Sequence, residues 1–319
     1  MKTYLGVDVG SVSTNVVALN EECEVISRQY LRTSGRPLEK VREALRNLNS
    51  ELPELDVLAV GTTGSGRQLT GIMIGADMVK NEITAHAYSA IHSYPDVRTI
   101  IEIGGQDSKL ILIKDQLVVD FAMNTVCAAG TGSFLDHQSE RLDIPIEKFG
   151  DMALNSKRHV RIAGRCTVFA ESDMISKHQF GFSNEDIING LCEALVRNYI
   201  NNLGRGKVLE PPFVFQGGVA ANKGIRAAFE RELECEINIP ENYDVMGAIG
   251  AALIAREHFL KTSEKTKFRG FSSVDLDFTP SAFECDDCTN RCEVIKVEMD
   301  GKVVAMWGDR CMKWTNSVR

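Results

Sequence analysis

Hydrophobic positions in the first hundred residues switch between alternating and helical spacing. Residues 3–9 (TYLGVDV) alternate and are rich in β-forming side chains, which predicts a strand, and residues 15–20 and 25–31 predict two more around the turn NEE. Apolar residues at helical spacing predict a helix over 37–48 (PLEKVREALRNL). A buried strand (VLAVGT) and a Gly/Ser turn (GTTGSGRQL) follow. We therefore expect a sheet packed by helices.

A second unit begins near Arg98 and repeats features of the first. Residues 99–123 predict strands joined by turns, helices dominate from Gly132 to about Gly204, and residues 211–230 predict a strand, a Gly-Gly turn and a helix. The segments YLGVDVGS and TIIEIGGQDS each place an acidic residue beside a glycine turn. This repetition predicts a duplicated α/β domain with a cleft between its halves. The expected boundaries are 1–97, 98–256, and a linker with a cysteine-rich tail over 257–319.

Composition narrows the possible classes of function. The 319 residues are 44% hydrophobic and carry a formal net charge of −8, which argues against non-specific nucleic-acid binding because that needs a dense basic surface. No apolar run approaches the ~20 residues that span a bilayer, and the N-terminus lacks the apolar run of a signal peptide. We expect a cytoplasmic protein without membrane partners. Nine cysteines then point to metal or redox chemistry rather than disulfides.

Three glycine turns follow predicted strands and are candidates for phosphate binding. Backbone amides in such turns bind anions, and glycine lets the backbone approach a phosphate closely. A fourth turn, before the helix that starts near Gly132, is expected beside the same cleft. The candidate nucleotide-binding residues are Gly10, Ser11, Val12, Ser13, Thr14, Gly104, Gly105, Gly130, Thr131, Gly132, Gly217, Gly218 and Val219.

Two of these turns carry an aspartate. Asp8 and Asp107 are candidates to hold Mg²⁺, mostly through its waters, and Gln106 or Asp107 is the candidate to orient an attacking water. The alternative is that both aspartates only cap their turns.

At this point the sequence resembles a known superfamily. GVDVGSVST, IEIGGQDSK and FVFQGGVAAN are similar to the phosphate-1, phosphate-2 and adenosine motifs of the actin, sugar kinase and Hsp70 superfamily, which implies duplicated ribonuclease H-like domains. More narrowly, IGGQDSK, NEITAHA (81–87), NTVCAAGTGSFLD and IAGRCTVFAESDMIS resemble activators of 2-hydroxyacyl-CoA dehydratases in the BadF/BadG/HgdC ATPase group. The resemblance covers roughly residues 3–256. Short activators commonly have lysine where this chain has Asn15, so a cationic phosphate contact is not expected there.

Cys127 and Cys166 both precede predicted helices, the second with Thr167 as a possible N-cap. A helix N-terminus favours thiolate, the form that binds metal. Two such cysteines are half of a [4Fe–4S] ligand set, and a twofold homodimer would supply the other half. The resemblance implies the same arrangement. The alternative is two buried structural cysteines.

Cys23, Cys192 and Cys235 have no partner at ligand spacing and are expected to be ordinary cysteines that bind no metal.

The tail contains a second group of cysteines. Cys285, Cys288, Cys292 and Cys311 flank a sequence in which Asp300–Gly301 predicts a two-residue hairpin turn. Ideal pairing about this turn places Cys311 opposite position 290, so four thiols are expected to converge at the hairpin base. The metal is left open between Zn²⁺ and a second [4Fe–4S] cluster.

These features support an ATP site and a pair of cluster cysteines, and the resemblance implies that the ATPase is coupled to electron transfer. The resemblance implies that ferredoxin or flavodoxin reduces the shared cluster, and that ATP binding and hydrolysis drive the electron to an iron–sulfur dehydratase or reductase. The alternative is a sugar or small-metabolite kinase, which would not need cysteines at two helix starts. A third possibility is a non-catalytic regulator that uses ATP as a switch.

Overall fold

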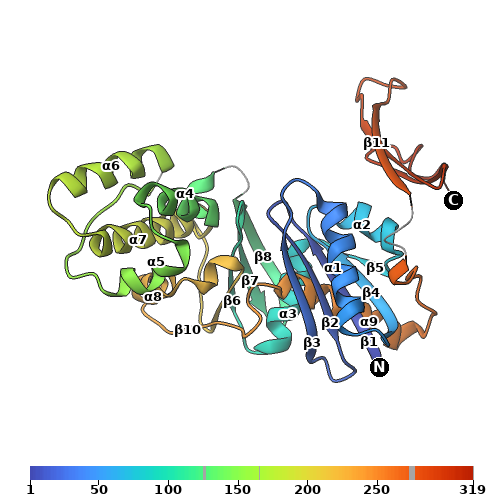
Figure 1. Cartoon of the computed structure of the whole chain (residues 1–319), viewed down its shortest axis with the longest axis horizontal. Helices are drawn as coiled ribbons and strands as arrows, with labels where there is room; N and C mark the ends of the chain where they lie inside the picture. Colours follow the sequence, from blue (N-terminus) through green and yellow to red (C-terminus); the bar gives the residue numbers. More distant parts are fainter. Residues whose placement is uncertain (125–126, 165, 273–276, 319) are drawn as a thin grey trace. The chain divides into compact units, whose positions relative to one another are not determined.

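The computed structural model describes residues 1–124, 127–164, 166–272 and 277–318. Residue contacts divide the chain into two compact units. Unit 1 comprises residues 1–10, 14–81 and 251–319, and unit 2 comprises residues 11–13 and 82–250. Figure 1 traces the elements of both units in chain order.

Unit 1 is built on a five-stranded mixed sheet in the order β3-β2-β1-β4-β5. Its strands are β1 (Lys2–Val9), β2 (Ser13–Leu19), β3 (Val25–Arg32), β4 (Asp56–Thr63) and β5 (Met78–Val79). β1 pairs antiparallel with β2 and parallel with β4. Helix α1 (Pro37–Glu51) buries Val41, Ala44, Leu45 and Leu48, the spacing of one helical face, and contacts β1 and β3. The expected strands and helix of this region are confirmed.

Unit 2 has its own five-stranded sheet, in the order β10-β9-β6-β7-β8. Its strands are β6 (Thr99–Ile103), β7 (Ser108–Lys114), β8 (Leu117–Asn124), β9 (Phe213–Gln216) and β10 (Ile237–Asn238). β6 pairs antiparallel with β7 and parallel with β9, and β7 pairs antiparallel with β8. Read from β8, this order matches that of unit 1 strand for strand, so the expected duplication is present in the topology.

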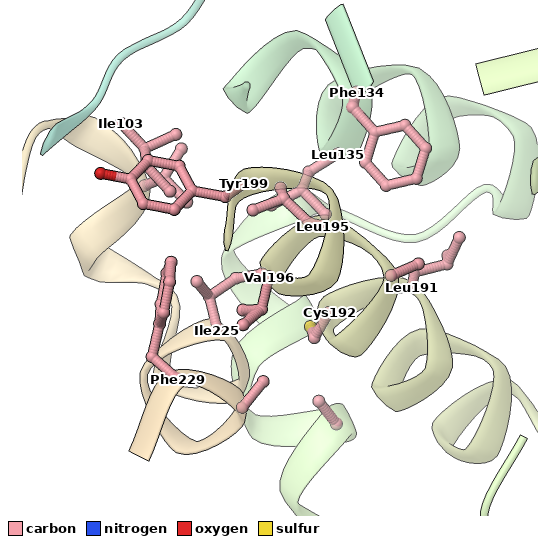
Figure 2. Packing of buried hydrophobic residues seen from close by; sticks show 14 of the residues in the cluster. Ile103, Phe134, Leu135, Leu191, Cys192, Leu195, Val196, Tyr199, Ile225 and Phe229 are labelled. Atoms are coloured by element: carbon pink, nitrogen blue, oxygen red, sulfur yellow. The ribbon is translucent and has the colours of Figure 1, made fainter. Parts of the chain in front are cut away.

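Helices form the core of unit 2 against one side of its sheet. They are α4 (Gly132–Leu142), α5 (Ile146–Leu154), α6 (Thr167–Gln179), α7 (Asn184–Leu203) and α8 (Lys223–Leu233). Figure 2 shows α7 side chains packed among residues of α4, α8 and β6, with Tyr199 edge-on to Phe229. Cys192 lies inside this core, and burial raises its pKa to about 12, so it remains a neutral thiol.

Two helices were not expected from the sequence. Helix α2 (Arg67–Ile74) follows the Gly/Ser turn of unit 1, and helix α3 (Glu82–Ser93) coincides with the NEITAHA motif. α3 contacts β7 and β8, so it groups with the second sheet although it precedes residue 98. The expected division of the ATPase halves at residue 97 stays a prediction.

The last helix and the tail complete unit 1. Helix α9 (Met246–Thr262) begins in unit 2 and ends in unit 1. The tail is a three-stranded antiparallel sheet of β11 (Phe278–Glu284), β12 (Glu293–Met299) and β13 (Lys302–Trp307). The hairpin about Asp300–Gly301 is confirmed, whereas β11 is an additional edge strand. Among the described residues, no helix is long and apolar enough to cross a membrane.

Candidate nucleotide site and cysteine segments

The first candidate phosphate turn joins β1 to β2. Asp8 pairs with Asn15, and Val9 with Thr14, on either side of the turn. A second turn supports it: the Gly66 amide and the Ser65 hydroxyl both donate to the Val9 carbonyl, at 2.9 and 3.2 Å. Gly64 has φ +89°, and a Cβ there would lie 2.5 Å from Asp8 Oδ1, so only glycine fits beside this aspartate.

The second candidate turn, Gly104–Asp107, is bonded to the start of α4. The amides of Gly132 and Ser133 donate to the carbonyls of Gly104 and Gly105 at 2.9 and 2.8 Å, and the Ser133 hydroxyl also donates to Gly105 at 2.6 Å. Two of the amides at the N-terminus of α4 therefore bind the turn. A displacement of Gly104–Gly105 has to move the first turn of α4 or break these bonds.

The third candidate turn meets the second through small residues. A Cβ on Gly132 would lie 3.1 Å from Gly104 O and 3.2 Å from a Val219 methyl. Gly217 has φ +90°, and a Cβ there would lie 2.4 Å from Ile103 O. Within unit 2, the structure thus brings the residues around Gly104, Gly132 and Gly217 together. Val12, which belongs to unit 2, lies against Gly105, where a Cβ would be 2.8 Å from its methyl groups.

A buried lysine lies directly behind the second turn. Lys109 is 2% exposed, and its Nζ lies 2.9 Å from Glu82, 2.9 Å from Glu102 and 3.0 Å from Asp107. Burial alone would lower the pKa of Lys109, but the three neighbouring carboxylates raise this pKa, so the side chain stays charged. Burial raises the pKa of Glu102 to about 7 against the opposing effect of Lys109. Lys109 therefore fixes Asp107 in place.

Asp107 is the one carboxylate of this cluster that is substantially exposed, with 32% of its side chain accessible. Its Oδ2 contacts Lys109, and its backbone carbonyl accepts from the Gly104 amide at 3.0 Å. An anchored, partly exposed carboxylate at the end of a glycine turn is suited to Mg²⁺ or to a metal-bound water.

The NEITAHA motif supports the turns from α3. Glu82 contacts Lys109, and His86 Nδ1 lies 3.0 Å from Gln216 Nε2, which places the residue before Gly217. Burial lowers the pKa of His86 to about 3, so the ring is neutral and its Nδ1 accepts the Gln216 amide proton.

Cys127 lies between β8 and a short 3₁₀ helix, Ala128–Gly130. The Asn124 side chain holds it at both backbone groups, accepting from the Cys127 amide at 3.1 Å and donating to its carbonyl at 2.8 Å. The backbone at Cys127 is extended, φ −115° and ψ 119°, and its side chain is partly exposed. Cys127 thus precedes a glycine-containing turn that leads into the long helix α4, with the 3₁₀ turn and Thr131 between them.

Cys166 is itself the N-cap of α6, so the expected N-cap, Thr167, is instead the first helical residue. Its backbone is extended, φ −149° and ψ 135°, and its side chain is partly exposed. The two cysteines thus share a local setting, in which an extended, partly exposed residue precedes a helical turn.

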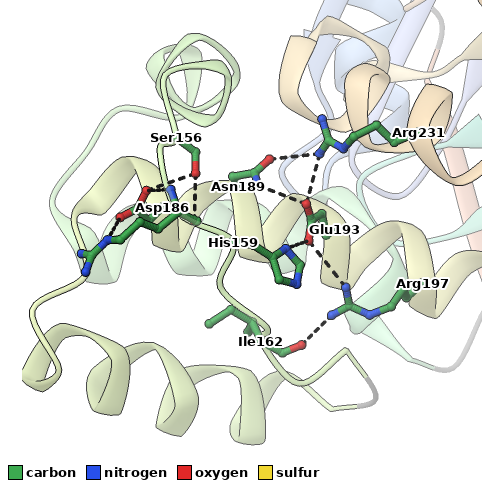
Figure 3. A network of polar contacts seen from close by, with 9 residues as sticks. Ser156, His159, Ile162, Asp186, Asn189, Glu193, Arg197 and Arg231 are labelled. Carbon is green, nitrogen blue, oxygen red and sulfur yellow. Dashed lines mark hydrogen bonds and ion pairs between the residues drawn. The ribbon is translucent and has the colours of Figure 1, made fainter.

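Helix α7 holds the chain that leads to Cys166. Figure 3 shows Asp186 in a network of polar contacts and the bond from Arg197 to the Ile162 carbonyl, at 2.7 Å. Asp186 accepts from the amides of Lys157 and Arg158, both at 2.9 Å. Burial alone would raise the pKa of Asp186, but the hydrogen bonds from Arg158 and Lys157 lower this pKa well below its usual value. Asp173 of α6 accepts from the Ala163 amide at 2.8 Å.

One side chain of α7 contacts both cysteine segments. Asn198 Nδ2 donates to the Gly164 carbonyl, and Asn198 Oδ1 would be 2.8 Å from a Cβ on Gly130. Gly164 lies two residues before Cys166, and Gly130 three residues after Cys127. Asn202 donates to Asn198 Oδ1 at 3.0 Å and so fixes the orientation of the amide. The neighbouring Tyr199 donates its hydroxyl proton to the Lys109 carbonyl at 2.7 Å.

The tail cysteines lie at one end of the three-stranded sheet. Cys285 follows β11, Cys292 precedes β12, and the Cys285 amide donates to the Cys292 carbonyl at 2.8 Å. A bulge at Val297–Glu298 shifts the register, so that Trp307 faces Ile295 and extrapolation places Cys311 opposite 291 instead of 290. Across the described ranges, no three cysteine, histidine or acidic side chains are grouped closely enough to hold a metal ion.

Sequence reasoning missed several residues of this region: Gly64, Glu82, His86, Lys109 and Asn198. Lys109 and Glu82 lie within the IGGQDSK and NEITAHA motifs, and this position was the one signal in the sequence that they matter. Their pairing joins residues that are far apart in the chain, so no local pattern predicts it. Asn198 reads as an ordinary polar position of a long helix.

Comparison with known proteins places the chain among nucleotide-binding ATPases. It is 36% identical to the (R)-2-hydroxyglutaryl-CoA dehydratase activating ATPase of Acidaminococcus fermentans over 256 residues, covering 79% of this chain and 96% of that protein. The structure of the activator of the 2-hydroxyisocaproyl-CoA dehydratase from Clostridium difficile with bound ADPNP matches with a TM-score of 0.75 and 32% identity, covering 82% of this chain and 97% of that one.

A more distant match shows the fold alone. A ROK family glucokinase from Streptomyces griseus, in complex with glucose and AMPPNP, gives a TM-score of 0.51 at 14% identity, covering 80% of this chain and 99% of that one.

The sequence profile of the BadF/BadG/BcrA/BcrD ATPase family matches residues 5–255, which leaves the tail outside the match. The chain therefore belongs to the BadF/BadG/BcrA/BcrD ATPase family.

Proposed function

We propose that this protein is an ATP-dependent one-electron donor that activates an iron–sulfur partner enzyme such as a 2-hydroxyacyl-CoA dehydratase. The observation that carries the proposal is the set of bonds between the second glycine turn and the cysteine segments. Gly104 and Gly105 bind the start of α4, which follows Cys127, and Asn198 contacts the segments of both cysteines. The relatives named above are activators of such dehydratases.

ATP with Mg²⁺ is the proposed nucleotide, and the three glycine turns are its proposed phosphate and adenosine contacts. Asp8 and Asp107 hold Mg²⁺ or its waters in this proposal, and Gln106 or Asp107 orients the attacking water. The ion pair of Lys109 with Asp107 supports this role, because a fixed carboxylate needs little reorganisation to bind a metal-bound water.

Cys127 and Cys166 are the proposed ligands of a [4Fe–4S] cluster, which supplies a single low-potential electron when bound. Their chemistry fits this group: both thiols are free, partly exposed and located at the start of a helical turn, and cysteine binds metal through its sulfur. Each chain offers two ligands where four are needed. A homodimer with one shared cluster completes the set.

The surface beside Cys166 supports an interface between subunits. Val168 and Phe169, the second and third residues of α6, are each 65% exposed. Large apolar side chains that remain exposed in one chain are typical of association surfaces.

The proposed coupling uses elements that are bonded to one another. Closure of the second turn around ATP would pull on the amides of Gly132 and Ser133 and so shift the start of α4. On the other side, Tyr199 ties α7 to β7 at Lys109, one residue away from Asn198. Nucleotide state and cysteine geometry then belong to one conformational equilibrium, which is what ATP-driven electron transfer requires.

The alternative function is phosphorylation of a sugar or small metabolite. The likeness to the glucokinase favours it only at the level of the fold. A kinase would use the same glycine turns, but it gives no reason for two partly exposed cysteines whose segments both contact Asn198.

Anaerobic purification with iron, sulfide and mass measurements tests the proposal. We expect a dimer with about four irons and four sulfides at the Cys127/Cys166 site. Cys127→Ser and Cys166→Ser should each abolish this iron, whereas Cys235→Ser, a partly exposed cysteine of the same unit, should retain it. An iron-free protein that converts ATP to ADP by phosphorylating a sugar would establish the kinase instead.

A further inference from the structure

The four cysteines of the tail are not used by the proposed ATPase and electron-transfer functions, and they lie outside the family match, which ends at residue 255. We propose that Cys285, Cys288, Cys292 and Cys311 bind one Zn²⁺ ion that holds the end of the tail sheet together. This inference does not depend on the proposed electron transfer.

The backbone places the first three cysteines in the connection between β11 and β12. Zinc binding would rotate their thiols toward one point, since these side chains are not grouped in the part of the chain that the structure describes. The Cys285 amide donates to the Cys292 carbonyl at 2.8 Å, which closes the connection between β11 and β12. Within it, the Arg291 amide donates to the Cys288 carbonyl at 3.2 Å. Cys285-x2-Cys288 and Cys288-x3-Cys292 both have the spacing of zinc knuckles, in which a short turn directs successive thiolates at one ion.

The chain after β13 brings the fourth cysteine to the same end. A Cβ on Gly308 would lie 2.4 Å from the Glu293 carbonyl, so the chain leaves β13 against the residue that follows Cys292. Trp314 Nε1 donates to Cys285 Sγ at 3.2 Å, and the Trp314 ring packs edge-on to Phe283, with centroids 5.1 Å apart. The segment that carries Cys311 is therefore packed on the segment that carries Cys285.

Charge around the thiols fits a bound tetrathiolate. Lys313 forms an ion pair with Asp287 and lies two residues after Cys311. A tetrahedral Zn²⁺ with four thiolates carries a net charge of −2, so a nearby cation and the Trp314 N–H donor would stabilise it. Zinc binding releases the four thiol protons.

The end of the tail that carries the cysteines has little core of its own, because the buried tail residues Phe278 and Val297 belong to the core of unit 1. Of the three strands, only Phe278, Val294 and Val297 are buried, and Cys285 is buried just beyond β11. Modules of this size are usually stabilised by a metal ion or disulfides. Zinc fits this site better than an iron–sulfur cluster does. Cys288 and Cys311 are exposed, and a structural zinc ion, unlike a redox cluster, does not need an electron-transfer partner.

Elemental analysis of the full chain tests this proposal. The protein is purified anaerobically under reducing conditions in the Cys127→Ser/Cys166→Ser background, treated with a chelator and titrated with ZnCl₂. We expect about one tightly bound zinc per chain. Cys288→Ser and Cys311→Ser change exposed thiols and should each lose this zinc, whereas Cys23→Ser, a partly exposed cysteine elsewhere in unit 1, should retain it.

Tryptophan fluorescence gives an independent readout, because both tryptophans of the chain, Trp307 and Trp314, lie in the tail. Their emission should change in step with zinc binding and reach its end point at one equivalent. Iron in place of zinc in this background, less than half an equivalent of bound zinc, or full zinc retention in Cys288→Ser and Cys311→Ser would each overturn the proposal.

Discussion

Replacement of Lys109 by methionine tests the buried charge cluster behind the second glycine turn. The substitution keeps the length of the side chain but removes the cation that contacts both Glu102 and Glu82. Three carboxylates would then lie together, two of them largely buried, without a cation. Removing one partner of a buried ion pair typically costs about 3–5 kcal/mol, because the remaining charge stays desolvated.

Hydrogen exchange followed by mass spectrometry measures this cost locally. If β6 and β7 open as a unit, exchange of their amides in Lys109→Met should accelerate about 150- to 5,000-fold, the equivalent of 3–5 kcal/mol. Amides of β1 in unit 1 provide an internal reference. Lys223→Met is the matched control, because Lys223 and Asp151 form an exposed pair, with 66% and 64% of their side chains accessible. It should change stability by less than about 1 kcal/mol.

Less than tenfold acceleration in Lys109→Met would refute the reasoning, since the cluster would then not depend on its cation. The same variant should also weaken Mg²⁺–ATP binding if Asp107 acts as proposed, because Asp107 loses its 3.0 Å contact with Lys109. The Lys109→Met/Glu102→Gln double variant should recover part of the stability, because it removes one of the unpaired carboxylates.

Three further predictions follow from single residues. Burial raises the Glu102 pKa from 4.5 to about 7, so between these pH values the folded state holds a proton that the unfolded state releases. The free energy of unfolding should therefore fall as pH rises from about 4.5 to about 7, by up to about 1.4 kcal/mol per pH unit. Urea titrations of Glu102→Gln, without metal or nucleotide, should lack this slope. Gln138 is fully buried, and neither polar atom of its side chain has a partner in the described chain, so Gln138→Met should raise the free energy of unfolding by about 1 kcal/mol or more; a loss of stability in thermal melts would contradict this. Gly164→Ala would place a Cβ 2.5 Å from the Ala194 carbonyl and should lower bound iron and stability together, and unchanged iron content would show that this contact does not position Cys166.

Local patterns in the sequence were sufficient to predict most strands and the duplicated arrangement. Alternating or continuous apolar runs mark β1, β6 and β9, and each ends at a glycine turn that the motif reading identified. The Asp300–Gly301 hairpin was equally accessible, because its turn chemistry is local. Strand β11 was missed because Pro280 and its exposed side chains suit an edge strand with little apolar signal.

The contacts that build the candidate site were not accessible in the same way. Lys109 reads as a polar residue of an alternating strand, yet it is buried because carboxylates from α3, β6 and the glycine turn surround it. The expected Mg²⁺ and cluster ligands stay predictions. What the structure adds is the support for them, in which Asn198 contacts both cysteine segments and the start of α4 rests on the second turn.

The most direct test of the central claim is the rate at which a chelator removes iron from the Cys127/Cys166 site in the presence of different nucleotides. The account predicts that iron is lost faster with Mg²⁺–ATP than with Mg²⁺–ADP, because closure of the glycine turn shifts the start of α4 beside Cys127. It also predicts that Ser133→Ala, which removes the 2.6 Å bond to Gly105, reduces the difference between the two nucleotides. Equal rates with ATP and ADP in the unmodified protein would contradict the proposed coupling.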